Sequence, residues 1–98
     1  MRYLIHSSCR RNIVDFYRHV AMKYRNTYSK GLMLKNIDEA VEGMYLIEKT
    51  LSRRCPTLEK WKKEGWNMTN AGKWYYAYTI SDDTIIIQDA CHAQNMHD

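Results

Sequence analysis

The spacing of apolar residues changes its period at Trp66, and this change limits the possible folds more than any other feature of the sequence. Before Trp66, apolar side chains recur every three or four residues, as in helices that bury one stripe. After it, they alternate with other residues at the period of two that a strand requires, at Trp74, Tyr76, Tyr78 and Ile80. A chain with these two parts has to pack helices on a sheet, which predicts an α+β fold.

A short opening strand and a first helix are expected at the start of the chain. Residues 2–7 alternate weakly and predict the strand. Ser7 or Ser8 can then cap a helix whose apolar stripe runs from Ile13 to Tyr28.

A second helix of similar length should follow and form a hairpin with the first. It begins near Leu32, or at Asn36 if a capping box forms there. It is expected to end at Arg53 or Arg54, because Cys55 precedes a proline and is therefore pushed out of the helical region.

The last third of the chain predicts a short helical turn and three strands. Residues 57–64 form the turn, with Leu58 and Trp61 pointing inward. Residues 66–93 form an antiparallel meander, which the opening strand joins as a fourth member. The expected order is β-α-α-β-β-β, with the helical hairpin on one face of a small, mainly antiparallel sheet. At 98 residues, the chain should form a single domain with one core.

The charge is unevenly distributed along the chain. Residues 1–63 hold 14 of the 15 basic residues and six acidic ones, a net charge of +8. Residues 64–98 hold only Lys73 against five acidic residues, a net charge of −4. This asymmetry indicates a basic surface for a nucleic acid or an acidic protein, although a solvated helical face would give the same pattern.

Chemically useful side chains gather near the end of the last strand. His92 titrates near neutrality and could act as a general acid or base, with Asp89 or a nearby tyrosine to orient it; alternatively it is a surface histidine at a frayed terminus. Cys91, His92 and His97 are poor metal ligands together, because neighbours in a strand point to opposite faces. No metal and no cofactor are expected, since no nucleotide or metalloprotease motif is present.

The strand at residues 73–80 offers a second candidate surface. Lys73, Tyr75 and Thr79 are expected on the face of this strand that points toward solvent. On such an open face Lys73 could hold a phosphate while the ring of Tyr75 stacks on an unpaired base. Equally, the lysine could pack along a cross-strand tyrosine. Further cations could line this face: Arg53, Arg54, Lys60, Lys62 and Lys63.

The three cysteines lack metal or disulfide spacing, and the start of the chain lacks a signal-peptide pattern, so a cytoplasmic protein without a membrane span is expected.

The closing stretch resembles the RelE/ParE superfamily of bacterial toxins from type II toxin-antitoxin modules. The resemblance lies in the segment GKWYYAYTI at residues 72–80, the acidic turn at residues 82–83, the run TIII at residues 84–87 and the tail CHAQNM at residues 91–96. Together with the order of the elements it covers essentially the whole chain, and it implies the RelE/ParE fold.

The resemblance implies a toxin that arrests growth and is neutralised by an acidic cognate antitoxin. The implied activity is metal-independent cleavage of messenger RNA, with or without the ribosome, by the RNA's own 2′-hydroxyl. His92, Tyr75 and Lys73 would be catalytic and would project to one open face of the sheet. Gln94 and Asn95 would contact RNA where relatives often carry basic residues, and Trp74 or Tyr75 stands where relatives usually have an arginine. The alternatives within the superfamily are a gyrase poison and a catalytically inactive antitoxin-binding protein.

Overall fold

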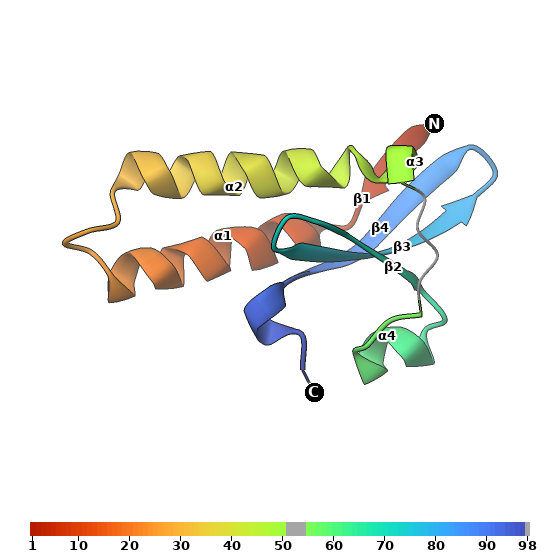
Figure 1. Cartoon of the computed structure of the whole chain (residues 1–98). Coiled ribbons are helices and arrows are strands. Elements are labelled where there is room, and N and C mark those ends of the chain that lie inside the picture. The colour runs from red at the N-terminus through yellow and green to blue at the C-terminus, as the bar shows by residue number, and fades with distance from the viewer. Residues whose placement is uncertain (51–54, 98) are drawn as a thin grey trace.

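The structure, a computed structural model, describes residues 1–50 and 55–97. It is an α+β fold in which the elements follow the expected order (Figure 1). The strands are β1 (Arg2–Ile5), β2 (Asn67–Ala71), β3 (Trp74–Ser81) and β4 (Thr84–His92). The helices are α1 (Ser7–Lys23), α2 (Lys30–Met44), α3 (Ile47–Thr50), α4 (Glu59–Lys63) and the 3-10 turn η1 (Ala93–Asn95).

The four strands form one sheet in the order β1-β4-β3-β2. β2, β3 and β4 are the expected antiparallel meander, and β1 joins as the fourth strand by pairing in parallel with β4. The expectation of a mainly antiparallel, four-stranded sheet is therefore confirmed. β1 pairs only with residues 84–87, so the second half of β4 continues past the end of β1.

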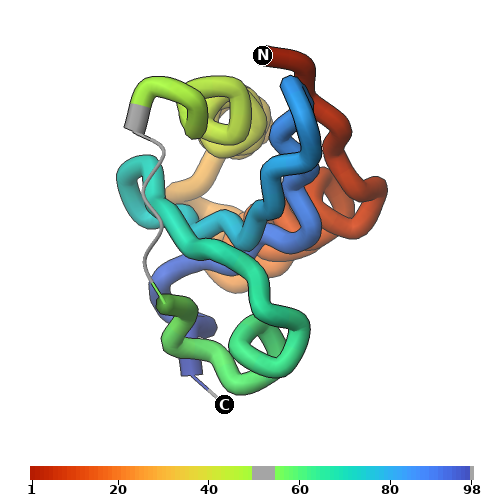
Figure 2. The backbone as a smooth tube through the Cα atoms, turned by 90° about the vertical axis from the view of Figure 1, so that its right-hand side faces the viewer, coloured from red at the N-terminus to blue at the C-terminus, as the bar shows by residue number. Residues whose placement is uncertain are grey.

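Helices cover both faces of the sheet, so the expectation of a single core is wrong. The hairpin of α1 and α2 packs on one face, over a cluster that includes Met44, Trp74 and Tyr78. Val20, which lies in the predicted apolar stripe of the first helix, is only half-buried. On the other face, α4 places Leu58 and Trp61 in a second, smaller cluster. Figure 2 shows α2 at the top of the molecule and α4 at the bottom, with the strands between them.

Both long helices begin at caps that differ from those expected. The Nδ1 atom of His6 accepts the Ser8 N–H at 3.1 Å, so His6 rather than Ser7 or Ser8 caps α1. The hydroxyl of Ser29 accepts the Leu32 N–H at 3.1 Å, and α2 therefore begins earlier than either predicted start.

The second helix ends at Met44, about a turn before α3, and not at Arg53 or Arg54. A tyrosine hydroxyl from β1 lies at this break: it donates to the Tyr45 carbonyl at 3.0 Å and accepts the Glu48 N–H at 3.2 Å. The hydroxyl of Tyr3 thus satisfies backbone groups that a continuous helix would pair internally. Arg53 and Arg54 themselves lie outside the described residues.

A β-bulge at Gln88 decides which side chains of β4 face the hairpin. Ala77 lies opposite Asp89 while Tyr78 lies opposite Ile87, so Gln88 is an extra residue on β4. Ile85 and Ile87 face the hairpin before the bulge, and Ala90 and His92 face it afterwards. The bulge therefore turns His92 toward α1.

No helix among the described residues is both long enough and apolar enough to cross a bilayer.

Candidate functional site

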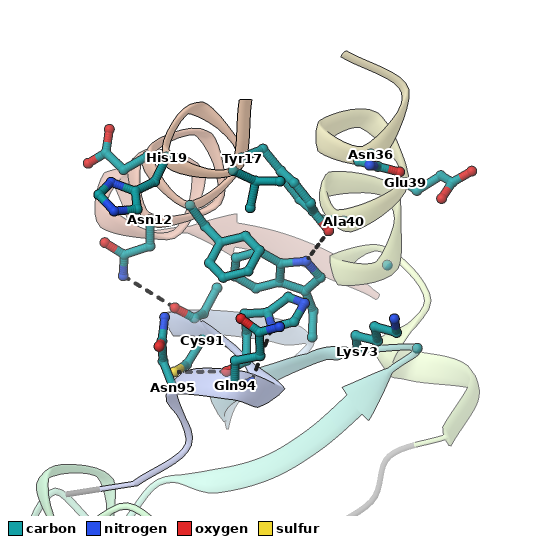
Figure 3. A pocket seen from close by; sticks show the side chains of 18 of the residues that line it. Asn12, Tyr17, His19, Asn36, Glu39, Ala40, Lys73, Cys91, Gln94 and Asn95 are labelled. Carbon is teal, nitrogen blue, oxygen red and sulfur yellow. Dashed lines mark hydrogen bonds between the residues drawn. The ribbon is translucent and has the colours of Figure 1, made fainter. Parts of the chain in front are cut away.

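A groove of about 1210 Å³ opens beneath the hairpin, where β3 begins and β4 ends (Figure 3). Its walls are α1, α2, the turn between β2 and β3, and η1. The side chains that line it include Phe16, Tyr17, Lys73, His92, Gln94 and Asn95. Open grooves lined by rings and a few polar groups are typical of ligand sites.

His92 is held firmly at the base of this groove. Its side chain is 6% exposed, and its ring stacks on Phe16 with centroids 4.1 Å apart and planes 13° apart. Trp74 approaches the same ring edge-on at 5.4 Å. The Nδ1 atom of His92 accepts the Gln94 N–H at 3.1 Å and caps η1. His92 is thus an ordered part of the fold, and the alternative of a histidine at a frayed terminus is wrong.

The electrostatic surroundings of His92 favour its neutral form. Burial lowers the pKa of its imidazole below the usual 6.5, and the positive charge of Lys73 lowers it further. Because Nδ1 accepts a hydrogen bond, the proton of the neutral ring resides on Nε2. In this arrangement His92 is a hydrogen-bond donor at Nε2 and has no free nitrogen to act as a base.

Lys73 lies in the turn between β2 and β3, which forms one wall of the groove. Gly72 before it has a φ of 59°, a left-handed conformation that glycine adopts without strain. The carbonyl of Lys73 accepts the Ala93 N–H at 2.8 Å, which ties the turn to η1 and holds it next to His92. The Lys73 side chain is exposed, so its ammonium group is available to an anion in the groove.

Tyr75 does not share a face with His92, so the expectation of three catalytic side chains on one open face is wrong. Trp74 is the cross-strand partner of His92, and Tyr75 is the partner of Cys91. Successive strand residues point to opposite faces. Tyr75 therefore lies on the α4 side of the sheet, where it packs against the second cluster.

Asp89 does not orient His92 either. Its Oδ2 atom accepts the indole N–H of Trp61 at 2.8 Å, and its Oδ1 atom accepts the Nδ2–H of Asn12 at 2.9 Å. Lys60 adds an ion pair at 3.6 Å. Asp89 thus joins α4 to α1 across the free edge of β4, which is a structural role.

The remaining predicted contact residues are divided between the groove and the rest of the surface. Gln94 and Asn95 are exposed on η1 and line the groove, and the α4 residue Lys60 reaches its rim. Lys62 pairs with Glu59 at 3.5 Å and does not line the groove. Lys63 is exposed and also lies away from it.

Aromatic residues of α1 and of the turn after it line the groove, and the sequence analysis did not predict them as site residues. Tyr17 accepts the indole N–H of Trp74 at 2.9 Å, and burial raises the pKa of its hydroxyl. Phe16 stacks on His92, and Tyr24 and Tyr28 continue the lining toward the end of the hairpin. The surplus of tyrosine over phenylalanine, eight to one, was the available signal for such rings.

Within residues 1–50 and 55–97, no cluster of three or more His, Cys, Asp or Glu side chains could hold a metal ion. Cys91 and His92 point to opposite faces of β4. Burial raises the pKa of the Cys9 thiol to about 12, so this thiol stays protonated and unreactive.

Comparison of the sequence with protein-family models gave no match, and neither did comparison with the curated proteins. The relationship to the RelE/ParE superfamily therefore stays a prediction.

The low pKa of His92 predicts a pH-dependent stability. In the unfolded chain His92 takes up a proton near its ordinary pKa of 6.5, whereas the folded protein resists protonation until a lower pH. Its contribution to the free energy of unfolding is thus fully present above pH 6.5 and is lost as the pH falls through the folded pKa. Urea unfolding from about pH 7.5 to about pH 5 should show a smaller loss of stability for His92→Gln than for the wild type. Equal losses in both proteins would contradict this prediction.

Proposed function

We propose that this chain is the toxin of a type II toxin-antitoxin module of the RelE/ParE kind and that it cleaves messenger RNA in the groove. The observation that carries the proposal is the convergence of His92 and Lys73, both expected from the sequence to be catalytic, on one groove with Gln94 and Asn95. The order of the elements and the helical hairpin on one face of the sheet support the same assignment.

The groove suits a single strand of RNA. Aromatic rings provide stacking surfaces for unpaired bases, and Lys73 offers a cation for a phosphate. The amide side chains of Gln94 and Asn95 supply hydrogen-bond donors and acceptors at the wall formed by η1.

Cleavage would proceed by attack of the 2′-oxygen on the adjacent phosphorus. The new O2′–P bond gives a cyclic phosphate, and the broken P–O5′ bond releases a 5′-hydroxyl. The Nε2–H group of His92 and the ammonium of Lys73 stabilise the negative charge that develops on the phosphate oxygens. A neutral imidazole can stabilise charge in this way without acting as a base. Water carries the proton from the 2′-oxygen to the departing 5′-oxygen.

The partner of such a toxin is an acidic antitoxin in the cytoplasm. The net charge of +8 on residues 1–63 favours association with an acidic chain. Co-purification with the product of a neighbouring gene should give a complex that weakens as salt is added.

A catalytically inactive antitoxin-binding protein, or a gyrase poison, is the second candidate. Two observations favour it: Tyr75 lies on the opposite face from His92, and the Nδ1 atom of His92 is engaged by η1. The first observation removes Tyr75 from the site, and the second leaves His92 without a free nitrogen, so neither residue fits the general acid-base role expected from the sequence.

Inducible expression of the wild-type chain in bacteria, with mapping of RNA 5′ ends and of DNA breaks, separates these functions. We expect growth arrest with new 5′-hydroxyl ends in messenger RNA. Arrest with intact RNA and accumulated DNA breaks would support the gyrase poison. Normal growth with unchanged RNA would support the inactive protein.

A further inference from the structure

The far end of the helical hairpin projects beyond the sheet (Figure 1). We call residues 18–35 the hairpin tip; it comprises the end of α1, the connecting turn and the start of α2. None of its residues is buried. The tip therefore contributes little to either core, and packing does not explain its composition.

The hairpin tip is strongly basic. It contains five cationic side chains and no acidic residue: Arg18, Lys23, Arg25, Lys30 and Lys35. All five are exposed, and none forms an ion pair with another residue in the part of the chain that the structure describes.

The stability of the helices does not account for these charges. Lys30 lies in the first turn of α2, which contains no acidic residue and where the helix macrodipole disfavours a cation. Five positive charges on one projection also repel one another. A concentration of charge that weakens the fold indicates a binding role.

Two features favour a nucleic acid over an acidic helix as the partner. A docked helix needs a continuous apolar seam, but the exposed Leu32 and Leu34 point about 160° apart around α2. In addition, Tyr24 is 51% exposed, next to Lys23, whose ammonium lies 5.5 Å from the centroid of the Tyr24 ring. A ring beside a cation is the combination that binds a base and its phosphate.

We propose that the hairpin tip is a second binding surface, which holds the phosphate backbone of single-stranded RNA and leads it into the groove. Lys23 and Tyr24 belong to both surfaces, so one strand can run from the tip to His92 without a break. The choice of RNA rests on the proposed function. The positive charge of the tip and the exposed ring of Tyr24 by themselves favour a single-stranded nucleic acid, either RNA or DNA.

The test measures binding of a fluorescent 2′-O-methyl RNA, which lacks the 2′-hydroxyl and cannot be cleaved, by anisotropy at several salt concentrations. The tip variant carries Arg25→Gln, Lys30→Gln and Lys35→Gln, none of which lines the groove. The control variant carries Arg2→Gln, Arg10→Gln and Lys49→Gln, three exposed cations outside the tip, and has the same net charge. Circular dichroism confirms that both variants fold.

We expect weaker binding by the tip variant, with a slope of log K against log salt that is shallower by about 2, because three phosphate contacts are lost. The control variant should bind like the wild type. Equal weakening of both variants, or no binding by the wild type, would overturn the proposal. Tighter binding of a DNA strand of the same sequence would overturn the choice of RNA. Cleavage of ordinary RNA is assayed separately. If the wild type binds RNA through the tip but does not cleave it, the proposed function is contradicted and the proposed binding surface is not.

Discussion

Replacing His92 with alanine is expected to lower RNA cleavage by about 10²–10³-fold, the usual cost of removing one donor to a developing oxyanion. The Nε2–H group is the donor in question, because Nδ1 is engaged by the Gln94 N–H. Cleavage of a labelled RNA by purified protein measures the effect, and inducible expression should show a matching loss of growth arrest. Binding of the antitoxin should be unchanged.

His92→Gln is the matched control for this variant. Its amide can still accept the Gln94 N–H and donate a hydrogen bond, so we expect part of the activity to remain. Because alanine also removes the stacking on Phe16, urea unfolding of each variant gives the folded fraction to which rates are normalised. Full activity in folded His92→Ala would remove His92 from the mechanism.

Replacing Tyr76 with alanine is expected to cost about 3–5 kcal/mol of the free energy of unfolding, as for other large buried rings. Tyr76 is fully buried under α2, and its hydroxyl donates to the Ala40 carbonyl at 2.6 Å. A Cβ atom at Gly43 would lie 2.8 Å from that hydroxyl oxygen, which shows how closely helix and ring fit. Burial also raises the pKa of this hydroxyl, so it remains a donor. Urea unfolding followed by circular dichroism measures the loss.

Tyr76→Phe separates the ring from the hydroxyl. It keeps the apolar volume and should cost only about 1 kcal/mol, the net value of a typical hydrogen bond. A small domain has a total stability of about 5–15 kcal/mol, so the alanine variant should be largely unfolded at moderate urea while the phenylalanine variant is not. Similar midpoints for both variants would contradict the packing seen beneath α2.

The candidate site could be predicted from the sequence only in part. His92 was expected from its residue type and its place near the end of the last strand. Lys73 was expected as a cation beside Tyr75 and from the resemblance to the RelE/ParE superfamily, and the structure brings His92 and Lys73 to one groove. Tyr75 was predicted to lie on the same face as His92. In the structure it pairs with Cys91, whose side chain points to the face opposite that of His92. The register between two strands depends on contacts over long separations, which local spacing does not contain. The walls contributed by α1 were missed for the same reason.

Local chemistry was enough to predict the order of the main elements and the coarse fold. The change of period at Trp66 predicted α+β architecture, and the apolar pair Leu58 and Trp61 predicted the inward face of α4, because both patterns arise within a few residues. Only the tertiary structure decided where α2 stops, since the hydroxyl that meets its end comes from Tyr3, more than forty residues earlier. Likewise, only the pairing of β3 with β4 places the bulge at Gln88, and that bulge turns His92 into the groove while Asp89 faces α4.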